Sequence, residues 1–275
     1  MSLRINTNIA SLHAQSQLRL TSRDLERDLS QLASGTRFSY PGADAATSAI
    51  SQQLKAQQKG IEAAAQNADI AHSFIQTAEG SLNEQNNILI RLRELAVQGA
   101  SDTYSDKERE FLNLEAAQLK DEFDRIALSA SFGSTKLLSG ENKSYEFQVG
   151  HTGNSESRIQ FTNEANTRAS ELSVDSIEVS DKSSARDSLN TIDEALTSIA
   201  GVRAQFGSVQ SRLEHAGDFL LNQRSAIAEA KSRLSDTDVA QVVSNVKRNQ
   251  VLQQYQAQVL NEANQAPIAA LKLVA

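Results

Sequence analysis

Metal binding or acid–base catalysis would require histidines, cysteines or carboxylates at recurring spacings along the chain. The chain contains no cysteine and four histidines, which are His13, His72, His151 and His215. None of the histidines has a second histidine or a glutamate at the spacing of a known metal-binding helix. His72 and His215 fall outside the apolar stripes of the chain, so we expect both to face solvent. The histidines therefore predict no metal site.

The carboxylates are equally poor candidates for catalysis. Asp121 and Glu122 lie beside Lys120 and Arg125, which is typical of the solvated face of a helix. The sequence has no glycine-rich phosphate loop, no nucleophile elbow and no dinucleotide-binding fingerprint. We therefore expect no enzymatic activity and no cofactor.

Charge and hydropathy argue against two further classes of protein. The net charge is −7 and the longest basic run is Lys247-Arg248, so a nucleic-acid partner is not expected. The first twenty residues lack the basic start and continuous apolar stretch of a secretory signal peptide. No apolar run reaches the length of about 18 residues that a membrane-spanning helix needs, so membrane insertion is not expected either.

The composition instead favours long helices. Aromatic residues make up 5% of the chain, tryptophan is absent and proline occurs twice. Alanine, leucine and glutamine are abundant, and all three are good helix formers. Small side chains with few rings suit the packing of helix on helix better than a thick layered core.

The clearest apolar stripe lies in the second half of the chain. Large apolar residues recur at every seventh position, namely at Ile192, Ile199, Phe206, Leu213, Leu220, Ile227 and Leu234. Three residues after each comes a smaller partner, with a polar break at Gln223, which is the pattern of a coiled-coil seam. At 1.5 Å per residue this seam is roughly 60 Å long. Another long helix must lie beside it.

The first half of the chain supplies partners for this seam. One stripe with alternating spacings of four and three runs from Ile50 to Ala96, and a second runs from Leu112 to Ala130. Residues 99–103 separate them as a turn, after which Ser105 and Glu108 form a capping box. The sequence therefore predicts a mainly α fold, a long antiparallel coiled-coil or helical-bundle rod built from both halves of the chain.

Residues 140–182 follow a different pattern. Tyr145, Phe147 and Val149 alternate with polar residues, as do Ile159 and Phe161 after a glycine-containing linker. This alternation predicts a small β-hairpin at the mid-chain end of the rod, which would cap its far end. Residues 173–180 are a further candidate strand.

Both ends of the chain are poor in charge. Residues 1–18 hold only Arg4, and residues 249–271 hold only Glu262. A surface helix of a monomer normally has a charged outer face. Burial of both termini in an assembly explains the composition better.

Several motifs, in one order over both halves, resemble those of bacterial flagellins. In the first half they are Ile5-Asn6-Thr7-Asn8, Leu32-Ala33-Ser34-Gly35-Thr36-Arg37, Arg91-Leu92-Arg93-Glu94-Leu95-Ala96-Val97-Gln98 and Glu122-Phe123-Asp124-Arg125-Ile126. In the second half they are Gln210-Ser211-Arg212-Leu213-Glu214 and the tail Ala263-Asn264-Gln265-Ala266-Pro267. The resemblance covers about residues 1–140 and 185–275. At Pro41-Gly42 the chain departs from the usual family pattern, and a break between the terminal helix and the rod is expected there.

The resemblance implies a structural subunit that polymerises head-to-tail into the flagellar filament. Residues 1–42 and 235–275 would form its inner core, residues 43–139 and 183–234 the rod, and residues 140–182 the surface-facing part. From their places on uncharged helices, we expect self-assembly to rest on Ile5, Ile9, Leu12, Val251, Leu252, Val259 and Leu260. Two alternatives remain open, a hook–filament junction protein and a cytoplasmic coiled-coil scaffold.

The resemblance also implies partners and a location. The chain would be secreted by the flagellar export apparatus without a cleavable signal, and would meet an export chaperone and cap or junction proteins. In family members that the vertebrate innate flagellin receptor recognises, an Arg, a Leu and a Glu form the epitope. The matching positions here are Arg91, Leu95 and Glu115.

Overall fold

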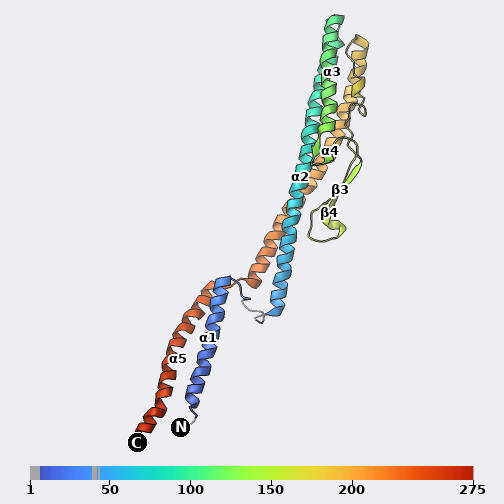
Figure 1. The fold of residues 1–275 in the computed structure, drawn as a ribbon. Coiled ribbons are helices and arrows are strands. Elements are labelled where there is room, and N and C mark those ends of the chain that lie inside the picture. Colours follow the sequence, from blue (N-terminus) through green and yellow to red (C-terminus); the bar gives the residue numbers. More distant parts are fainter. Residues whose placement is uncertain (1–6, 39–41, 43, 275) are drawn as a thin grey trace. The chain divides into compact units, whose positions relative to one another are not determined.

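The structure is a computed structural model that describes residues 7–38, 42 and 44–274, with side chains up to residue 265. Its helices are α1 (Ile9–Ser34), α2 (Ala45–Gly99), α3 (Asp106–Ser129), α4 (Lys182–Ser235) and α5 (Val239–Val274) (Figure 1). Its strands are β1 (Ser131–Phe132), β2 (Thr135–Lys136), β3 (Lys143–Gln148) and β4 (Arg158–Asn163). The expected mainly α fold with a small β-hairpin is confirmed, and a second short hairpin, β1–β2, accompanies it.

The chain forms two compact units. One comprises residues 1–56 and 226–275, and therefore holds α1 and α5 with the first turns of α2 and the last turns of α4. The other comprises residues 57–225 and holds most of α2 and α4, all of α3 and the strands.

In the unit of residues 57–225, α2 and α4 run antiparallel. Side-chain contacts between them proceed from His72–Glu214 through Glu79–Arg203 to Arg93–Asp193, so the numbering rises on α2 as it falls on α4. The expected out-and-back arrangement of the two halves is confirmed.

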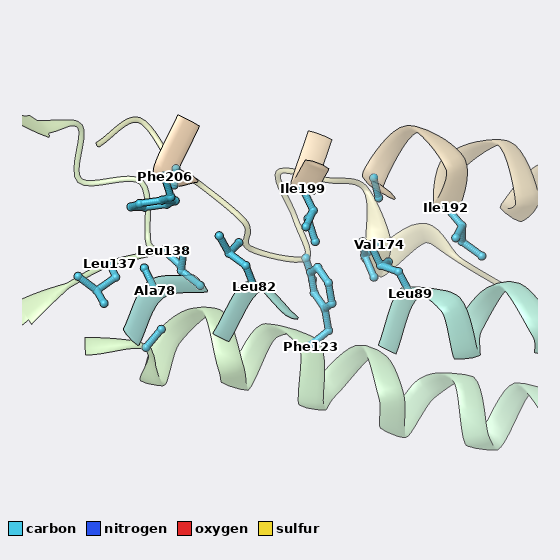
Figure 2. Packing of buried hydrophobic residues seen from close by; sticks show 14 of the residues in the cluster. Ala78, Leu82, Leu89, Phe123, Leu137, Leu138, Val174, Ile192, Ile199 and Phe206 are labelled. Carbon is cyan, nitrogen blue, oxygen red and sulfur yellow. The ribbon is translucent and has the colours of Figure 1, made fainter. Parts of the chain in front are cut away.

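Packing of large side chains against small ones fills this unit. Figure 2 shows the core, in which residues of α2, α3 and α4 meet those of the connecting segments. Alanines of α2 at positions 64, 68, 71 and 78 are buried opposite the seam of α4. Five residues of that seam are at most 2% exposed, namely Ile192, Ile199, Phe206, Leu213 and Leu220. Ile227 and Leu234, which belong to the unit of residues 1–56 and 226–275, are half-buried.

Local sequence explains the ends of the helices. Gly35 has a φ of 67° and donates its amide to Gln31, a left-handed ending that glycine adopts without strain and that stops α1. The expected capping box of Ser105 and Glu108 begins α3. The expected break between α1 and α2 is present, since α1 ends at Ser34 and α2 begins at Ala45. Pro41 itself lies outside the described residues.

Strands β3 and β4 form the expected antiparallel hairpin, in which Tyr145 pairs with Phe161 and Phe147 with Ile159. The hairpin lies alongside α2, because Asn67 Nδ2 donates to the carbonyl of Gln148 at 3.2 Å. It does not cap the far end of the rod. That end, at the turn between α2 and α3, is approached instead by residues 178–182, which precede and begin α4.

The strand expected at residues 173–180 is wrong. Ser173 has a φ of 55°, which extended backbone does not allow, and a 3-10 turn follows at Val174–Ser176. Val174, Ile177 and Val179 are fully buried in the core, so their apolar character reflects packing and not pairing in a sheet. Among the described residues, the strands form two separate two-stranded sheets, β1–β2 and β3–β4.

Candidate assembly surface

Helices α1 and α5 lie side by side and antiparallel, and polar side chains join them (Figure 1). Asn8 Nδ2 donates to the carbonyl of Ala263 at 2.6 Å, and Ser11 Oγ donates to Asn264 Oδ1 at 2.8 Å. Further along the pair, Gln253 Nε2 donates to Ser22 Oγ at 3.2 Å and Asn249 Nδ2 donates to Asp28 Oδ2 at 3.0 Å.

The buried residues of α1 are all polar. They are Ser11, Thr21 and Asp28, and each is less than 9% exposed. On α5, Val242 and Val246 are buried near the start of the helix. An ordinary amphipathic pair would also place apolar residues at the inner positions that Ser11, Thr21 and Asp28 occupy.

Many other large apolar side chains lie on the outer faces of the pair. On α1, Ile9 is 50% and Leu12 is 56% exposed, and on α5, Val251 is 66% exposed. The remaining exposed apolar residues of the pair are Leu20, Leu29, Val239, Val243, Leu252, Tyr255 and Val259. Val251, Tyr255 and Val259 recur every four residues and therefore share one face of α5.

The structure thus places most of the expected assembly residues at the surface. Ile9, Leu12, Val251, Leu252 and Val259 are exposed, while Leu260 is half-buried. Ile5 lies outside the described residues. Many large exposed apolar residues on one helix pair are typical of a surface that another protein covers.

A second group of expected residues lies on α2 and α3. Arg91 Nε donates to Glu115 Oε1 at 2.8 Å, and Arg91 Nη1 donates to Glu94 Oε2 at 2.8 Å. These hydrogen bonds, to Glu94 and then to Glu115, raise the pKa of the Arg91 guanidinium. Leu95 is fully buried in the core. The structure therefore brings Arg91 and Glu115 together at the surface and places Leu95 beneath it.

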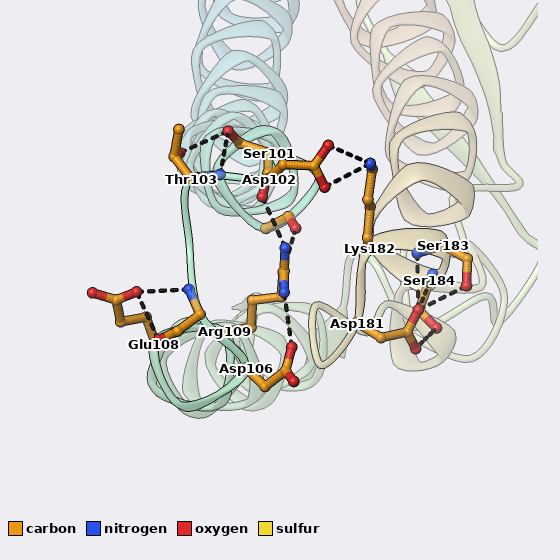
Figure 3. A network of polar contacts seen from close by, with 12 residues as sticks. Ser101, Asp102, Thr103, Asp106, Glu108, Arg109, Asp181, Lys182, Ser183 and Ser184 are labelled. Atoms are coloured by element: carbon orange, nitrogen blue, oxygen red, sulfur yellow. Dashed lines mark hydrogen bonds and ion pairs between the residues drawn. The ribbon is translucent and has the colours of Figure 1, made fainter.

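A polar network holds the turn between α2 and α3 against the start of α4 (Figure 3). Arg109 Nε and Nη2 each donate to a backbone carbonyl at 2.9 Å, those of Gly99 and Ser101, and so satisfy acceptors that the end of α2 leaves unpaired. Lys182 Nζ lies 2.6 Å from the carboxylate of Asp102. Together these contacts fix the segments that meet at this end of the unit.

The carboxylate of Asp181 caps the first turn of α4. It accepts hydrogen bonds from the hydroxyls of Ser184 and Ser183 and from the backbone amides of both residues. These hydrogen bonds stabilise the ionised carboxylate and hold the pKa of Asp181 far below its usual value. Asp181 thus acts as a helix cap.

The histidines are dispersed. His72 is partly exposed and lies 3.5 Å from Glu214, whereas His13, His151 and His215 are exposed. Within residues 7–38, 42 and 44–274, no cluster of three histidine, aspartate or glutamate side chains has the arrangement of a metal site. The helices in the same ranges contain no segment apolar enough to cross a membrane.

The family models for bacterial flagellins match both halves of the chain. The model of the bacterial flagellin N-terminal helical region matches residues 5–143, and that of the C-terminal helical region matches residues 189–274. The chain belongs to the bacterial flagellin family.

Whole-length relatives agree with the flagellin assignment. The chain is 33% identical to a flagellin of Halalkalibacterium halodurans over 98% of its own length and 99% of the relative. It is also 33% identical, with the same coverage, to the flagellar filament core protein flaB2 of Brachyspira hyodysenteriae. A flagellin of Bacillus subtilis is 32% identical over 99% of this chain and 100% of the relative.

Solved structures share the fold. The crystal structure of Bacillus cereus flagellin has a TM-score of 0.51 and 28% identity, and the match covers 60% of this chain and 94% of that one. A putative flagellar hook-associated protein from Vibrio parahaemolyticus has a TM-score of 0.60 over 70% of this chain and all of that one. Its 14% identity makes this a likeness of fold alone.

Sequence reasoning missed the polar inner residues of the α1–α5 pair. Leu18, Leu25 and Leu32 recur every seven residues on α1, and Thr21 and Asp28 occupy the alternate positions of the same stripe. The missed signal was therefore the spacing of two polar residues relative to the leucines. Leu29, in contrast, is 46% exposed and lies outside the inner seam.

Proposed function

We infer that this chain is a structural subunit of the bacterial flagellar filament. The flagellin family is a family of structural proteins, and this chain aligns over nearly its whole length with flagellins and with a filament core protein. The two alternatives, a hook–filament junction protein and a cytoplasmic scaffold, find no such support. As a flagellin, the chain belongs to an extracellular filament.

We propose that polymerisation proceeds through the outer faces of the α1–α5 pair. The observation that carries this proposal is the composition of the pair, whose inner seam mixes polar with apolar residues while Ile9, Leu12, Val251 and Val259 lie outside. Burial of such residues by a neighbouring copy stabilises association through the hydrophobic effect, at about 25 cal/mol per Å² of apolar surface. Repeated head-to-tail contact that does not close into a ring produces an open helical polymer.

We further propose that different segments of the chain occupy different places in the filament. Residues 1–42 and 235–275 would line the inner core of the filament, residues 43–139 and 183–234 would form the rod, and residues 140–182 would face outward. The half-buried Leu260, together with Ile5, would join the inner contacts on assembly.

The decisive experiment compares two charged variants of α5. Val251→Asp places a carboxylate on the exposed apolar face, where burial by a neighbour would desolvate it. Ala257→Asp adds the same charge at an exposed position on the other side of the same helix. Electron microscopy after addition of a precipitating salt should show filaments for the parent and for Ala257→Asp, and none for Val251→Asp.

Either of two results would count against the proposed surface. Filaments formed by Val251→Asp would show that this face stays solvated in the polymer. Equal loss of filaments in both variants would show that added charge on α5, wherever it is placed, prevents assembly. A parent protein that stays monomeric under all assembly conditions would contradict the filament function itself.

The resemblance to flagellins also supports proposals about other partners. We propose export through the flagellar secretion apparatus with the help of a chaperone, followed by contact with cap and junction proteins at the ends of the filament. Secretion of the chain by a strain with an intact export apparatus, and its retention when the apparatus is deleted, is the result expected.

Recognition by the vertebrate innate flagellin receptor is proposed for the Arg91–Glu115 pair. Both side chains lie at the surface and are joined at 2.7 Å, whereas Leu95 is buried and would act only by packing beneath them. A reporter-cell assay should respond to the parent monomer and lose the response in Arg91→Ala. No response to the parent at high dose would dispose of this proposal.

A further inference from the structure

The inner seam between α1 and α5 is a heptad seam with a polar middle. Each seam position is at least half-buried, and the spacings alternate between three and four. The α1 seam consists of Ser11, Ala14, Leu18, Thr21, Leu25, Asp28 and Leu32. The α5 seam consists of Val242, Val246, Asn249, Gln253, Gln256, Leu260 and Ala263. Three consecutive seam positions of α5 are thus amides.

Hydrogen bonds across the pair follow a single antiparallel register. As the α1 residue rises from Ser11 to Ser22 to Asp28, its α5 partner falls from Asn264 to Gln253 to Asn249. In the Asp28–Asn249 contact, at 3.0 Å, Asp28 is 6% exposed, as is Ser11 in its contact with Asn264. The polar contacts therefore agree with one another on how the two helices are aligned.

Leucine and valine contacts alone do not select this alignment, because they are not directional and recur every heptad. A slip of one heptad in one direction sets the Asp28 carboxylate against Val242, which offers no donor. A slip in the other direction sets Asp28 against Gln256, whose amide can donate, but carries Asn249 past Ser34, where α1 ends. A buried carboxylate without a donor is costly, so the first slip is disfavoured. The second slip leaves Asn249 and Val242 beyond the end of α1, so Val242 loses its burial.

The polar middle of the seam does not maximise the stability of the α1–α5 pair. Gln256 Oε1 is buried without a hydrogen-bond partner among the described residues, and such a group destabilises a folded pair. Buried polar side chains in coiled coils characteristically exchange stability for a unique register. The seam of α1 and α5 has the composition of that arrangement.

We propose that Asp28 and Asn249 are positioning residues that fix the register of α1 against α5. The inference rests on the proposed function, because register matters most where a neighbouring copy binds residues of both helices. A slip of one heptad displaces the exposed face of α5 along α1 by about 10 Å. The exposed Leu12 of α1 and the exposed Val259 of α5 would then be displaced relative to one another along the pair. A neighbouring copy could not bind every subunit in the same way.

The absence of cysteine from the chain allows a direct measurement of register in the full-length protein. Ser22→Cys with Gln253→Cys reports the register of the structure, since the parent side chains are hydrogen-bonded. Gln15→Cys with Gln253→Cys reports the slip of one heptad that sets Asp28 against Val242. A short thiol crosslinker is applied under assembly conditions, and the crosslinks made within one chain are quantified on a denaturing gel. The readout is the ratio of register to slipped crosslink.

Three backgrounds are compared, the parent, the pair Asp28→Leu with Asn249→Leu, and the exchanged pair Asp28→Asn with Asn249→Asp. The leucine pair should keep the helices together but lower the ratio on the order of tenfold, because its contacts are not directional. The exchanged pair retains one carboxylate and one amide donor and should restore the parent ratio. A merely structural role would not predict this restoration.

The proposal is overturned if the leucine pair leaves the ratio unchanged, if the exchanged pair fails to restore it, or if the parent shows no preference for the register crosslink. Electron microscopy of the same samples separates this result from the proposed function. Preserved register without filaments would contradict the filament function and leave the positioning role intact. Filaments with mixed register in the parent would contradict the positioning role and leave the filament function intact.

Discussion

Gly99 is the last residue of α2, and the segment that leads into α4 crosses directly over it. A Cβ added at Gly99 would overlap Val179 Cγ1, and Val179 is itself fully buried. A Cβ added at Gly80, which lies in the interior of the same helix, would meet nothing within 4 Å. The same substitution therefore has opposite expected effects at the two glycines.

We expect Gly99→Ala to destabilise the unit of residues 57–225 by about 1–3 kcal/mol, because an overpacked core must shift. Gly80→Ala should stabilise it by about 0.5–1 kcal/mol, because alanine has the higher helix propensity. Urea unfolding followed by circular dichroism measures both. Destabilisation of equal size at the two positions would contradict the close approach of Val179.

The carboxylate of Asp181 should make the stability of the protein depend on pH. Its carboxylate has a pKa far below the usual value of 3.8, because hydrogen bonds from Ser184 and Ser183 stabilise the charged form. A depressed pKa contributes stability that is fully present above the unfolded value and is lost as the pH falls through the folded one. Stability should therefore be constant from neutral pH down to about 5 and decline below about 4.

The variant Asp181→Ser keeps a helix cap but cannot titrate. The difference in urea midpoint between pH 7 and pH 3 should be smaller in this variant than in the parent. Asp102 and Glu108 also have lowered pKa values, through Lys182 and Ser105 respectively, so part of the acid sensitivity should remain. An equal loss of stability on acidification in both proteins would contradict the role of Asp181.

At the scale of the element, the spacing of the apolar residues determined which helices and strands the sequence could predict. The seven-residue recurrence from Ile192 to Leu220 identified α4 and its buried face, because only a helix brings such residues to one side. The alternation of Tyr145 and Phe147 identified β3 for the corresponding reason. The capping box at Ser105 was readable because it needs only local contacts.

The sequence was less informative where an apolar run had two explanations. Residues 173–180 carry β-branched side chains, yet Val174, Ile177 and Val179 pack into the core from irregular backbone. The inner face of α1 was equally hidden, because Thr21 and Asp28 look like surface residues until α5 is placed beside them. Long-range partners decided both cases, and periodicity within one segment does not report them.

Phe74 of α2 attaches the β3–β4 hairpin. Its ring lies 5.0 Å from that of Tyr145 and 5.9 Å from that of Phe147, measured between centroids, and the side chain is 5% exposed. Phe74→Ala should destabilise the protein by about 3–5 kcal/mol. It should also raise hydrogen exchange in β3 and β4.

Phe111→Ala is the matched control for this prediction, because Phe111 is 69% exposed on α3. The same atoms are deleted there without opening a cavity, so stability should change little. Unchanged exchange of the strand amides in Phe74→Ala would mean that the hairpin is held by other contacts.

At the scale of the whole molecule, the two units predict separable properties. The unit of residues 57–225 contains its own core, which includes Ile75, Phe123 and Ile199. Deletion of residues 1–20, or of the last twenty residues, should leave a soluble, helical protein that no longer forms filaments. Size-exclusion chromatography with circular dichroism tests the fold, and electron microscopy tests assembly.

Two outcomes of the truncations would be informative in opposite ways. Filaments formed by a truncated protein would show that the deleted part of α1 or of α5 is dispensable for polymerisation. Aggregation or loss of helix would show that the unit of residues 57–225 depends on the terminal helices for its folding.

The apolar outer faces of α1 and α5 also set a limit on how much free protein can accumulate. Each subunit that joins an open polymer buries the same surface, so growth begins at a threshold concentration and continues until the monomer falls back to it. Protein made beyond that threshold lengthens filaments and leaves the monomer concentration constant. A change such as Val251→Asp would raise the threshold, whereas a more apolar residue at the same position would lower it and favour premature association wherever the chain is made.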